Sequence, residues 1–311
     1  MKFGKVVKTV AVASAMLVMA VGLTACGKKS ADTGSYEPKK LVVEFKPSSN
    51  AGSADSQVKP LEKLLTKQLH VPVKVVMQTS GSSMVEALGS KTADVAFLSP
   101  ADYVLAHKNY QVKPLLQGTR FKYDDNENHT SKTSDTFISE VVVKKDSGIN
   151  SLKDLKGKKI ATQDATSTAG YIYPAVEMNE QGINLHKNGI KTFTVKGHDQ
   201  AVMAVENGNA DAAFCFEGAR KIASKDDPKI MENTKVIYKT KPIPNDAIAV
   251  RSDMSAKWDT KITDAFQNIA KSKEGHDILN SLYGYEGFAK INDKDFNGVR
   301  KNLEDVKKID K

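Results

Sequence analysis

The 311-residue sequence is poor in cysteine, arginine and aromatic side chains, and each shortage excludes a class of protein. Two cysteines allow one disulfide at most, so the fold must depend on its hydrophobic core. Four of the 46 basic residues are arginine and 7% of all residues are aromatic. A nucleic-acid groove normally combines clustered arginine with interleaved aromatic rings, so this composition argues against nucleic-acid binding.

Catalytic and metal-binding motifs are also missing. The six histidines include no His-x-x-x-His pair, and we find neither a Gly-x-Ser-x-Gly elbow nor a glycine-rich phosphate loop. Asp124, Asn126, Asn128 and Asp135 fall at liganding positions of a calcium loop, but His129 replaces the required glycine. We therefore expect no metal, no cofactor and no catalytic residue, and we interpret 121–136 as a solvated insertion.

The first 26 residues have the pattern of a bacterial export signal. Three lysines precede an apolar run over 10–22, which is too short to span a bilayer comfortably. The run ends in Leu-Thr-Ala-Cys at 23–26, which resembles the lipobox of bacterial lipoproteins. We expect 1–25 to be cleaved and Cys26 to carry palmitate and diacylglycerol as a membrane anchor. The alternative is a plain secretory signal with a chance cysteine.

Cleavage would lower the formal net charge from +9 to +6, because 1–25 holds three lysines and no acidic residue. Residues 26–40 are polar and rich in glycine, serine and lysine, which predicts a flexible tether. If Cys26 is acylated, Cys215 has no intramolecular partner. Arg220 and Arg251 match no motif and are predicted to be solvated.

Residues 41–311 alternate β-branched runs with helical patterns, which is typical of an α/β fold. Val85–Phe97 and Val202–Phe214 share a helix, a turn and Ala-Asp-x-Ala-Phe, so they predict equivalent units in two similar lobes, although coincidence is an alternative. We expect the first lobe to comprise 41–136 and 247–311, with the second lobe, 137–246, inserted. Two hinged lobes with a ligand cleft between them describe a Venus-flytrap binding protein.

The segment from Lys159 to Pro174 is the most informative one for a ligand. A strand leads into Ala-Thr-Ser-Thr-Ala-Gly-Tyr at 165–171, which opens a helix. Hydroxyls and unpaired N–H groups at a helix start favour an anion. The alternative is that Ser167 or Thr168 only caps the helix.

The same segment carries a family resemblance. Ser-Thr-Ala-Gly-Tyr-Ile-Tyr-Pro at 167–174 resembles the Ser-Thr-Ser-Gly-Tyr-x-x-Pro motif of phosphonate/phosphite-binding proteins of ABC importers. Residues 151–159 and 94–103 are similar to two further segments of that family, and the resemblance covers 41–283. It implies a type II periplasmic-binding-protein fold and a phosphonate-type, tetrahedral phosphorus oxyanion as ligand.

The resemblance also implies a ligand-binding set drawn from both lobes. Hydroxyls and an amide would bind the ligand's oxygens, a histidine and a phenol would add donors, and two carboxylates would receive an amine or a proton. In that order, these residues are Ser167, Thr168 and Ala169, then His198 and Tyr103, then Glu217 and Asp246. As alternatives, His198 can be a helix-start residue without a ligand, Glu217 a surface carboxylate and Tyr103 a core residue.

Two departures from the motif affect the expected ligand. Ala169 replaces the third hydroxyl, and Gly81 stands where the family often has tyrosine, which predicts a lost phenol and a gain of volume.

We therefore predict a monomeric, extracytoplasmic lipoprotein that delivers its anion to an ABC permease and ATPase, on the outer face of the cytoplasmic membrane if the cell is Gram-positive. Rival hypotheses are a type II receptor for another small anion or an amino-acid-like ligand, a surface-anchored hydrolase and a sensor lipoprotein without a transporter.

Overall fold

Short runs of valine, isoleucine and alanine form the central strands of two sheets, because such side chains pack on both faces of a sheet that helices cover. The computed structural model describes residues 34–49, 51–124 and 126–309. The expected signal peptide 1–25, Cys26 and the tether up to residue 33 lie outside the described residues. Within those ranges, no helix has the length and hydropathy needed to cross a membrane.

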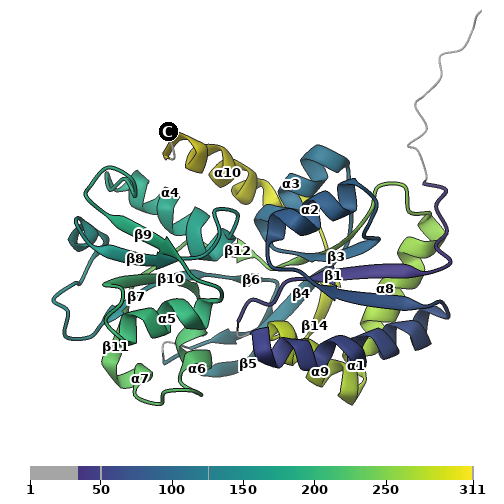
Figure 1. Cartoon of the computed structure of the whole chain (residues 1–311), viewed down its shortest axis with the longest axis horizontal. Coiled ribbons are helices and arrows are strands. Elements are labelled where there is room, and N and C mark those ends of the chain that lie inside the picture. The colour runs from purple at the N-terminus through teal and green to yellow at the C-terminus, as the bar shows by residue number, and fades with distance from the viewer. Residues whose placement is uncertain (1–33, 50, 125, 310–311) are drawn as a thin grey trace, which may run out of the picture. The chain divides into compact units, whose positions relative to one another are not determined.

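The first sheet has seven strands, and their spatial order differs from their order in the chain (Figure 1). That spatial order is β14 (Gly287–Lys290), β4 (Lys113–Tyr123), β13 (Ala247–Val250), β3 (Val95–Leu98), β1 (Leu41–Phe45) and β2 (Val73–Met77), with β5 (His129–Ser134) paired to β4. The strands β1, β2 and β3 are parallel, whereas β13 runs antiparallel to both β3 and β4.

The second sheet has five strands. In spatial order they are β11 (Thr234–Lys239), β7 (Ser139–Lys144), β10 (Ala212–Phe216), β8 (Lys159–Thr162) and β9 (Lys191–Thr194). A separate antiparallel ribbon of β6 (Thr136–Phe137) and β12 (Ile243–Pro244) carries both crossings of the chain between the sheets. The chain passes from β5 through β6 into β7, and it returns from β11 through β12 to β13.

The two sheets have the same arrangement around one central strand each. β3 lies between parallel β1 and antiparallel β13, and β10 lies between parallel β8 and antiparallel β7. A helix precedes each central strand: α2 (Gly81–Gly89) leads to β3, and α5 (His198–Glu206) leads to β10. The pairing confirms that the similar segments 85–97 and 202–214 are equivalent units.

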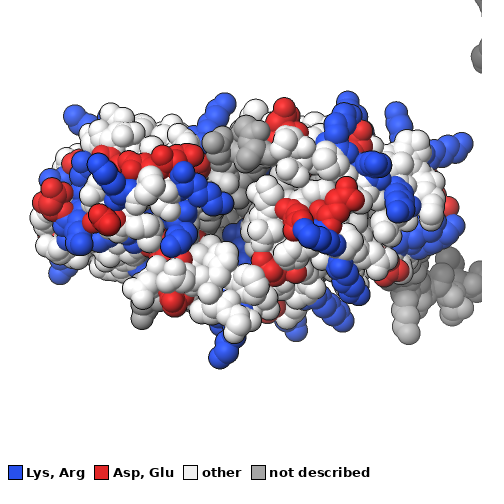
Figure 2. Space-filling view, turned by 90° about the horizontal axis from the view of Figure 1, so that it is seen from below, with Lys and Arg blue, Asp and Glu red and all other residues white. Residues whose placement is uncertain are grey.

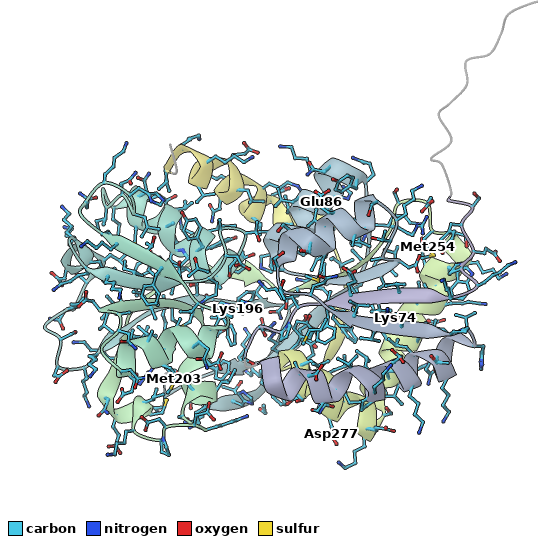
Figure 3. The ribbon with its side chains drawn as sticks, viewed as in Figure 1. Lys74, Glu86, Lys196, Met203, Met254 and Asp277 are labelled. Carbon is cyan, nitrogen blue, oxygen red and sulfur yellow. The ribbon has the colours of Figure 1, made fainter. Side chains whose placement is uncertain are left out.

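Helices cover both faces of each sheet (Figure 1). Around the first sheet these are α1 (Ala51–Leu69), α2, α3 (Pro100–Tyr110), α8 (Ala256–Lys271) and α9 (Lys273–Tyr283). Around the second sheet they are α4 (Tyr173–Glu180), α5, α6 (Ala219–Ala223) and α7 (Ile230–Asn233). Three short helical turns are η1 (Leu152–Leu155), η2 (Thr168–Ile172) and η3 (Asp293–Phe296). The helices α1, α8 and α9 share a core with one face of the first sheet, in which Met254, labelled in Figure 3, is fully buried. Helix α8 presents Ile262, Phe266 and Ile269 to that core at helical spacing.

The last helix, α10 (Asn297–Ile309), contacts helices of both sheets. It packs against α4 and α3, and it buries Val299, Leu303, Val306 and Ile309. The sequence predicts that this segment belongs to the first lobe, whereas its apolar face packs on helices from both sides.

Residues 121–136 are mostly exposed or half-buried, as expected of a solvated insertion, but they are more ordered than that interpretation implies. Strand β4 continues to Tyr123 and pairs with β5 to form a hairpin, and Glu127 near its turn is 3% exposed. The predicted solvation of Arg220 and Arg251 is wrong, because both are buried in ion pairs. Arg220 contacts Glu127 at 2.5 Å, and Arg251 contacts Asp94 at 3.1 Å. Neither pair leaves a local sequence signal, since each joins residues far apart in the chain.

The excess of lysine is distributed over the surface. Figure 2 shows lysine and arginine side chains interspersed with acidic ones on the face it presents. An anion site must therefore come from local groups rather than from the net charge.

Candidate functional site

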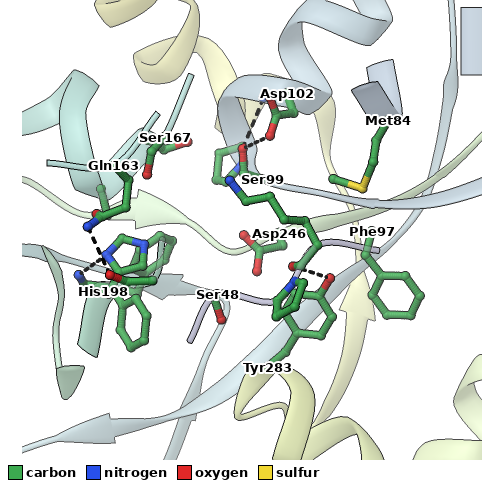
Figure 4. Close-up of a pocket in the computed structure, with 18 of the residues that line it drawn as sticks. Ser48, Met84, Phe97, Ser99, Asp102, Gln163, Ser167, His198, Asp246 and Tyr283 are labelled. Atoms are coloured by element: carbon green, nitrogen blue, oxygen red, sulfur yellow. Dashed lines mark hydrogen bonds between the residues drawn. The ribbon is translucent and has the colours of Figure 1, made fainter. Parts of the chain in front are cut away.

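A cavity of about 80 Å³ lies where the two sheets face each other, and we call it the anion cavity. Drug-sized ligands occupy pockets of about 300–1,000 Å³, so this volume suits a small ion. In Figure 4, Asp246 lies between His198 and Gln163 on one side and Tyr283 on the other.

One side of the cavity is formed by η2, a π-helical turn that follows β8 and leads into α4. Thr168 and Ala169 lie at its start, where the first N–H groups of a helix have no partner within it. Such turns are rare and often occur at functional sites. Pro174, near the start of α4, lacks an N–H and so donates no bond to the preceding turn.

The two hydroxyls of η2 have different partners. Ser167 caps the turn, because its Oγ accepts from the Gly170 N–H at 3.1 Å. Thr168 is 2% exposed, and its Oγ1 accepts from the Ala101 N–H at the start of α3 at 3.0 Å. The Thr168 hydroxyl hydrogen stays available to donate, so this residue joins the two sides and can still bind an anion.

His198 supplies a neutral donor at the start of α5. Its Nδ1 accepts from the Phe216 N–H at 3.2 Å, so the imidazole hydrogen is on Nε2. Burial, together with the nearby Lys46 and Arg120, lowers the pKa of His198 to about 3. The preceding Gly197 has a φ of +106°, which other residues rarely adopt, and so allows the sharp entry into α5.

Arg120 and Asp246 form a buried ion pair at the cavity. Arg120 Nη2 donates to Asp246 Oδ2 at 2.7 Å, and each side chain is 13% exposed. The Tyr285 hydroxyl donates to the same oxygen at 2.8 Å. The guanidinium lies 5.3–5.8 Å from the ring centroids of Phe137, Phe216 and Tyr285. Contacts with these three rings hold the Arg120 guanidinium in place beside the cavity.

Two further charged residues line the cavity from the first sheet. Lys46 follows β1 and pairs across the cavity with Asp164 at 2.9 Å. Asp102 in α3 accepts from the Ser99 hydroxyl at 2.6 Å. Burial raises the pKa of Asp102 to about 6, although the Ser99 hydrogen bond and Lys46 oppose that shift.

The Asp102 carboxyl also accounts for the glycine at position 81. A Cβ atom added to Gly81 would overlap the carboxyl group of Asp102. The expected gain of volume at Gly81 is therefore wrong, because an acidic side chain occupies that space.

Five of the seven predicted ligand-binding residues line the anion cavity, namely Ser167, Thr168, Ala169, His198 and Asp246. Tyr103 and Glu217 do not. The Tyr103 hydroxyl donates to Asp293 at 2.6 Å and its ring packs on Phe296, under the C-terminal segment. Glu217 lines a neighbouring cavity, where its carboxylate accepts from the Ile138 N–H at 3.2 Å. Burial raises its pKa.

Sequence reasoning missed Arg120, Lys46 and Asp102 as cavity residues. Arg120 is one of only four arginines in the sequence, and this scarcity was the only sequence feature that could have pointed to it as a binding residue. Asp102 lay inside a recognised family segment, but a carboxylate is not expected beside an anion. The cavity thus combines neutral donors with two cations and two carboxylates, a set able to hold an oxyanion through hydrogen bonds. Among the described residues, no cluster of three or more His, Cys, Asp or Glu could hold a metal.

The sequence of this chain is similar to those of known proteins. Residues 44–296 match the family model described as ABC transporter, phosphonate, periplasmic substrate-binding protein. The chain is 26% identical to the phosphate-import protein PhnD of Mycolicibacterium smegmatis, over 93% of this chain and 94% of that protein. It is 32% identical to the phosphonates-binding periplasmic protein of Escherichia coli, over 47% of this chain and 44% of that protein.

A solved structure shares the fold. The structure of PhnD1 from Prochlorococcus marinus in complex with methylphosphonate has a TM-score of 0.74 and 22% identity, and the match covers 88% of this chain and 100% of that one. The expected type II fold is thereby confirmed.

Proposed function

The chain belongs to the phosphonate-binding family of periplasmic substrate-binding proteins of ABC transporters, and we propose that it holds its ligand in the anion cavity. The observation that carries this proposal is the convergence of neutral donors and a fixed cation on one small space. Thr168 and His198 offer O–H and N–H groups from one side, and Arg120 adds a guanidinium from the other. Buried charge-assisted hydrogen bonds of this kind are strong and directional.

The proposed ligand is a small tetrahedral phosphorus oxyanion, such as methylphosphonate, phosphite or phosphate. The cavity of about 80 Å³ supports a small headgroup. The relatives support the same class, since one is named for phosphate import and another was solved with methylphosphonate. Asp246 and Asp102 would accept a hydrogen bond from a P–O–H group of the ligand, which favours a monoprotonated form.

Calorimetry on the full chain tests this ligand class. We expect heat of binding with at least one of methylphosphonate, phosphite and phosphate, and none with sulfate, which carries no proton near neutral pH. Absence of binding to every phosphorus anion would contradict the proposal.

We further propose two lobes, 41–136 with 247–311 and 137–246, that close about the β6–β12 ribbon. Three bonds between the sides support closure: Lys46 to Asp164, the Ala101 N–H to Thr168, and the His198 N–H to the Ser48 carbonyl at 3.2 Å. No bond of the ligand is broken in this account.

The membrane anchor is likewise a proposal. Cys26 would be acylated and would hold a monomeric receptor outside the cytoplasmic membrane, beside its permease and ATPase. Metabolic labelling with palmitate is expected to label the wild-type chain and not the Cys26→Ser variant. Equal labelling of both chains would contradict lipidation at this site.

A further inference from the structure

A second cavity of about 420 Å³ adjoins the anion cavity. The two share four lining residues, Ser48, Arg120, Phe216 and Tyr283. The volume of the second cavity falls within the about 300–1,000 Å³ that organic ligands occupy. A headgroup held beside Arg120 would therefore have a neighbouring space large enough for an organic substituent.

The β4–β5 hairpin forms an aromatic wall of the second cavity. Phe121 and Tyr123 come from β4, and His129 comes from β5. The His129 ring lies 5.6 Å from the Phe121 ring and 4.7 Å from the Tyr123 ring, between centroids. These tilted and edge-on contacts orient three rings along one side of the cavity, where a planar apolar group could pack against them.

A buried ion pair fixes this hairpin against the second sheet. Glu127, near the hairpin turn, pairs with Arg220 of α6 at 2.5 Å, and their side chains are 3% and 10% exposed. Arg220 Nε also donates to Thr234 Oγ1 at 2.9 Å, at the start of β11. The Tyr123 ring lies against Gly218, where a Cβ atom would overlap it. The aromatic wall is thus held at both its turn and its face.

The charges around the second cavity balance. Arg120, Lys221 and Lys225 line it together with Asp199, Glu217 and Asp226. Burial raises the pKa of Glu217, which makes its carboxylate a less favourable partner for a cation. Because the cationic and acidic side chains are equal in number, the second cavity does not strongly exclude ligands of either charge. The aromatic wall is therefore the feature that determines which substituent fits.

We propose that the second cavity is a subsite for an aromatic substituent on the phosphorus atom of the ligand. This inference rests on the proposed function: the oxyanion occupies the anion cavity, and an aryl group directed past Arg120 and Phe216 packs on Phe121, Tyr123 and His129. The substrate class is then arylphosphonates and aryl phosphate monoesters, in addition to small phosphorus anions.

Calorimetry with methylphosphonate, phenylphosphonate and 2-aminoethylphosphonate on the full chain tests the subsite. We expect phenylphosphonate to bind at least as tightly as methylphosphonate. The Phe121→Ala variant should weaken phenylphosphonate by about tenfold and change methylphosphonate by less than about twofold, since only the former contacts the ring. Phe193→Ala, in β9 and outside both cavities, is the matched control and should change neither affinity.

A second variant narrows the second cavity, whereas Phe121→Ala widens it. Ser281 lies on the exposed face of α9 and lines the second cavity, so Ser281→Trp is expected to fold normally. It should weaken phenylphosphonate by about tenfold and leave methylphosphonate unchanged.

The outcomes separate this inference from the proposed function. Binding of methylphosphonate with phenylphosphonate weaker by more than about tenfold would overturn the subsite and leave the function intact. Preference for 2-aminoethylphosphonate, unaffected by Phe121→Ala, would likewise overturn it in favour of an amine. If no phosphonate binds at all, the proposed function fails and the subsite fails with it.

Discussion

The two sides of the anion cavity are built from different chemistry. The side formed by the second sheet contributes Thr168, Ala169 and His198, which are neutral hydrogen-bond donors. Among the described residues that line the cavity, the charged Lys46, Asp102 and Arg120 come from the side of the first sheet, and Asp246 lies beside Arg120 at the return crossing, directly before β13. The difference suggests a division of roles, in which neutral donors recognise oxygen atoms and the opposite side sets the charge state that the cavity accepts.

The charges on the first side of the cavity also offset one another. Arg120 is paired with Asp246, and Asp102 lies opposite with a pKa of about 6. A cavity balanced in this way does not attract every anion, because a fully deprotonated ligand would face two carboxylates. The comparison therefore predicts that variants on the first side change charge selectivity, whereas variants on the second side weaken all oxyanions.

Removing the fixed cation should have the largest effect. Arg120→Ala leaves Asp246 buried without its ion-pair partner, which is expected to lower the free energy of unfolding by about 3–5 kcal/mol. Methylphosphonate affinity should fall by at least about 100-fold, as expected for a lost charge-assisted bond. Chemical denaturation and calorimetry measure the two effects.

Arg300→Ala is the matched control for that variant. Arg300 pairs with Asp293 outside the cavity, with the side chains 31% and 44% exposed, so its loss should cost under about 1 kcal/mol. Equal affinity loss in both variants would show that Arg120 has no special role.

Replacing both hydroxyls of the neutral side should have the next largest effect. Ser167→Ala with Thr168→Ala is expected to weaken every phosphorus anion by several kcal/mol, at about 1.5–3 kcal/mol for each charge-assisted bond. The double variant also removes the acceptor for the Ala101 N–H across the cavity. Thr260→Ala, on the exposed face of α8, controls for a general loss of stability. Unchanged calorimetric affinity in the double variant would mean that the ligand binds elsewhere.

A smaller effect is expected from Asp102→Asn, and it should appear in the pH profile. The folded-state pKa of about 6 lies above the ordinary value of 3.8, so Asp102 becomes negative as the pH rises through about 6. Anion affinity should therefore decrease more between pH 5 and 7 in the wild type than in the variant. The ligand's own titration is common to both chains and cancels in the comparison. If anion affinity changed with pH in the same way in the wild type and the variant, Asp102 would have no role in setting the charge state that the cavity accepts.

The smallest effect is predicted for Tyr103, which the sequence resemblance assigned to the ligand. Its hydroxyl is committed to Asp293 under η3, so Tyr103→Phe should change anion affinity by less than about twofold and stability by about 1 kcal/mol. A loss of affinity of about tenfold or more would return Tyr103 to the binding site.

The sequence was sufficient to predict the sheets, because each central strand is a run of buried apolar residues with a strong local signal. The alternating apolar runs expected over 41–311 include Leu41–Phe45 and Ala212–Phe216, and both are interior strands of their sheets. The hairpin within 121–136 was missed, because the ion pair that anchors it joins Glu127 and Arg220, which lie 93 residues apart. An ion pair between distant residues leaves no periodicity in either segment.

In the site, too, residues of a continuous motif were predicted and residues brought together from distant segments were missed. Ser167, Thr168 and Ala169 were predicted from a continuous motif, and they line the cavity as one turn of chain. Arg120 lies in β4 and Lys46 directly follows β1, and tertiary packing alone brings them to that turn. Tyr103 belonged to a matching segment, yet its side chain faces Phe296 rather than the cavity.

The most direct test of the account is a crystal structure of the chain with methylphosphonate. We predict phosphonate oxygens within about 3.2 Å of the Thr168 hydroxyl, His198 Nε2 and the Arg120 guanidinium, with the methyl group directed toward the second cavity. Methylphosphonate bound outside the anion cavity, without contact to Thr168 or His198, would contradict the division of roles between its two sides.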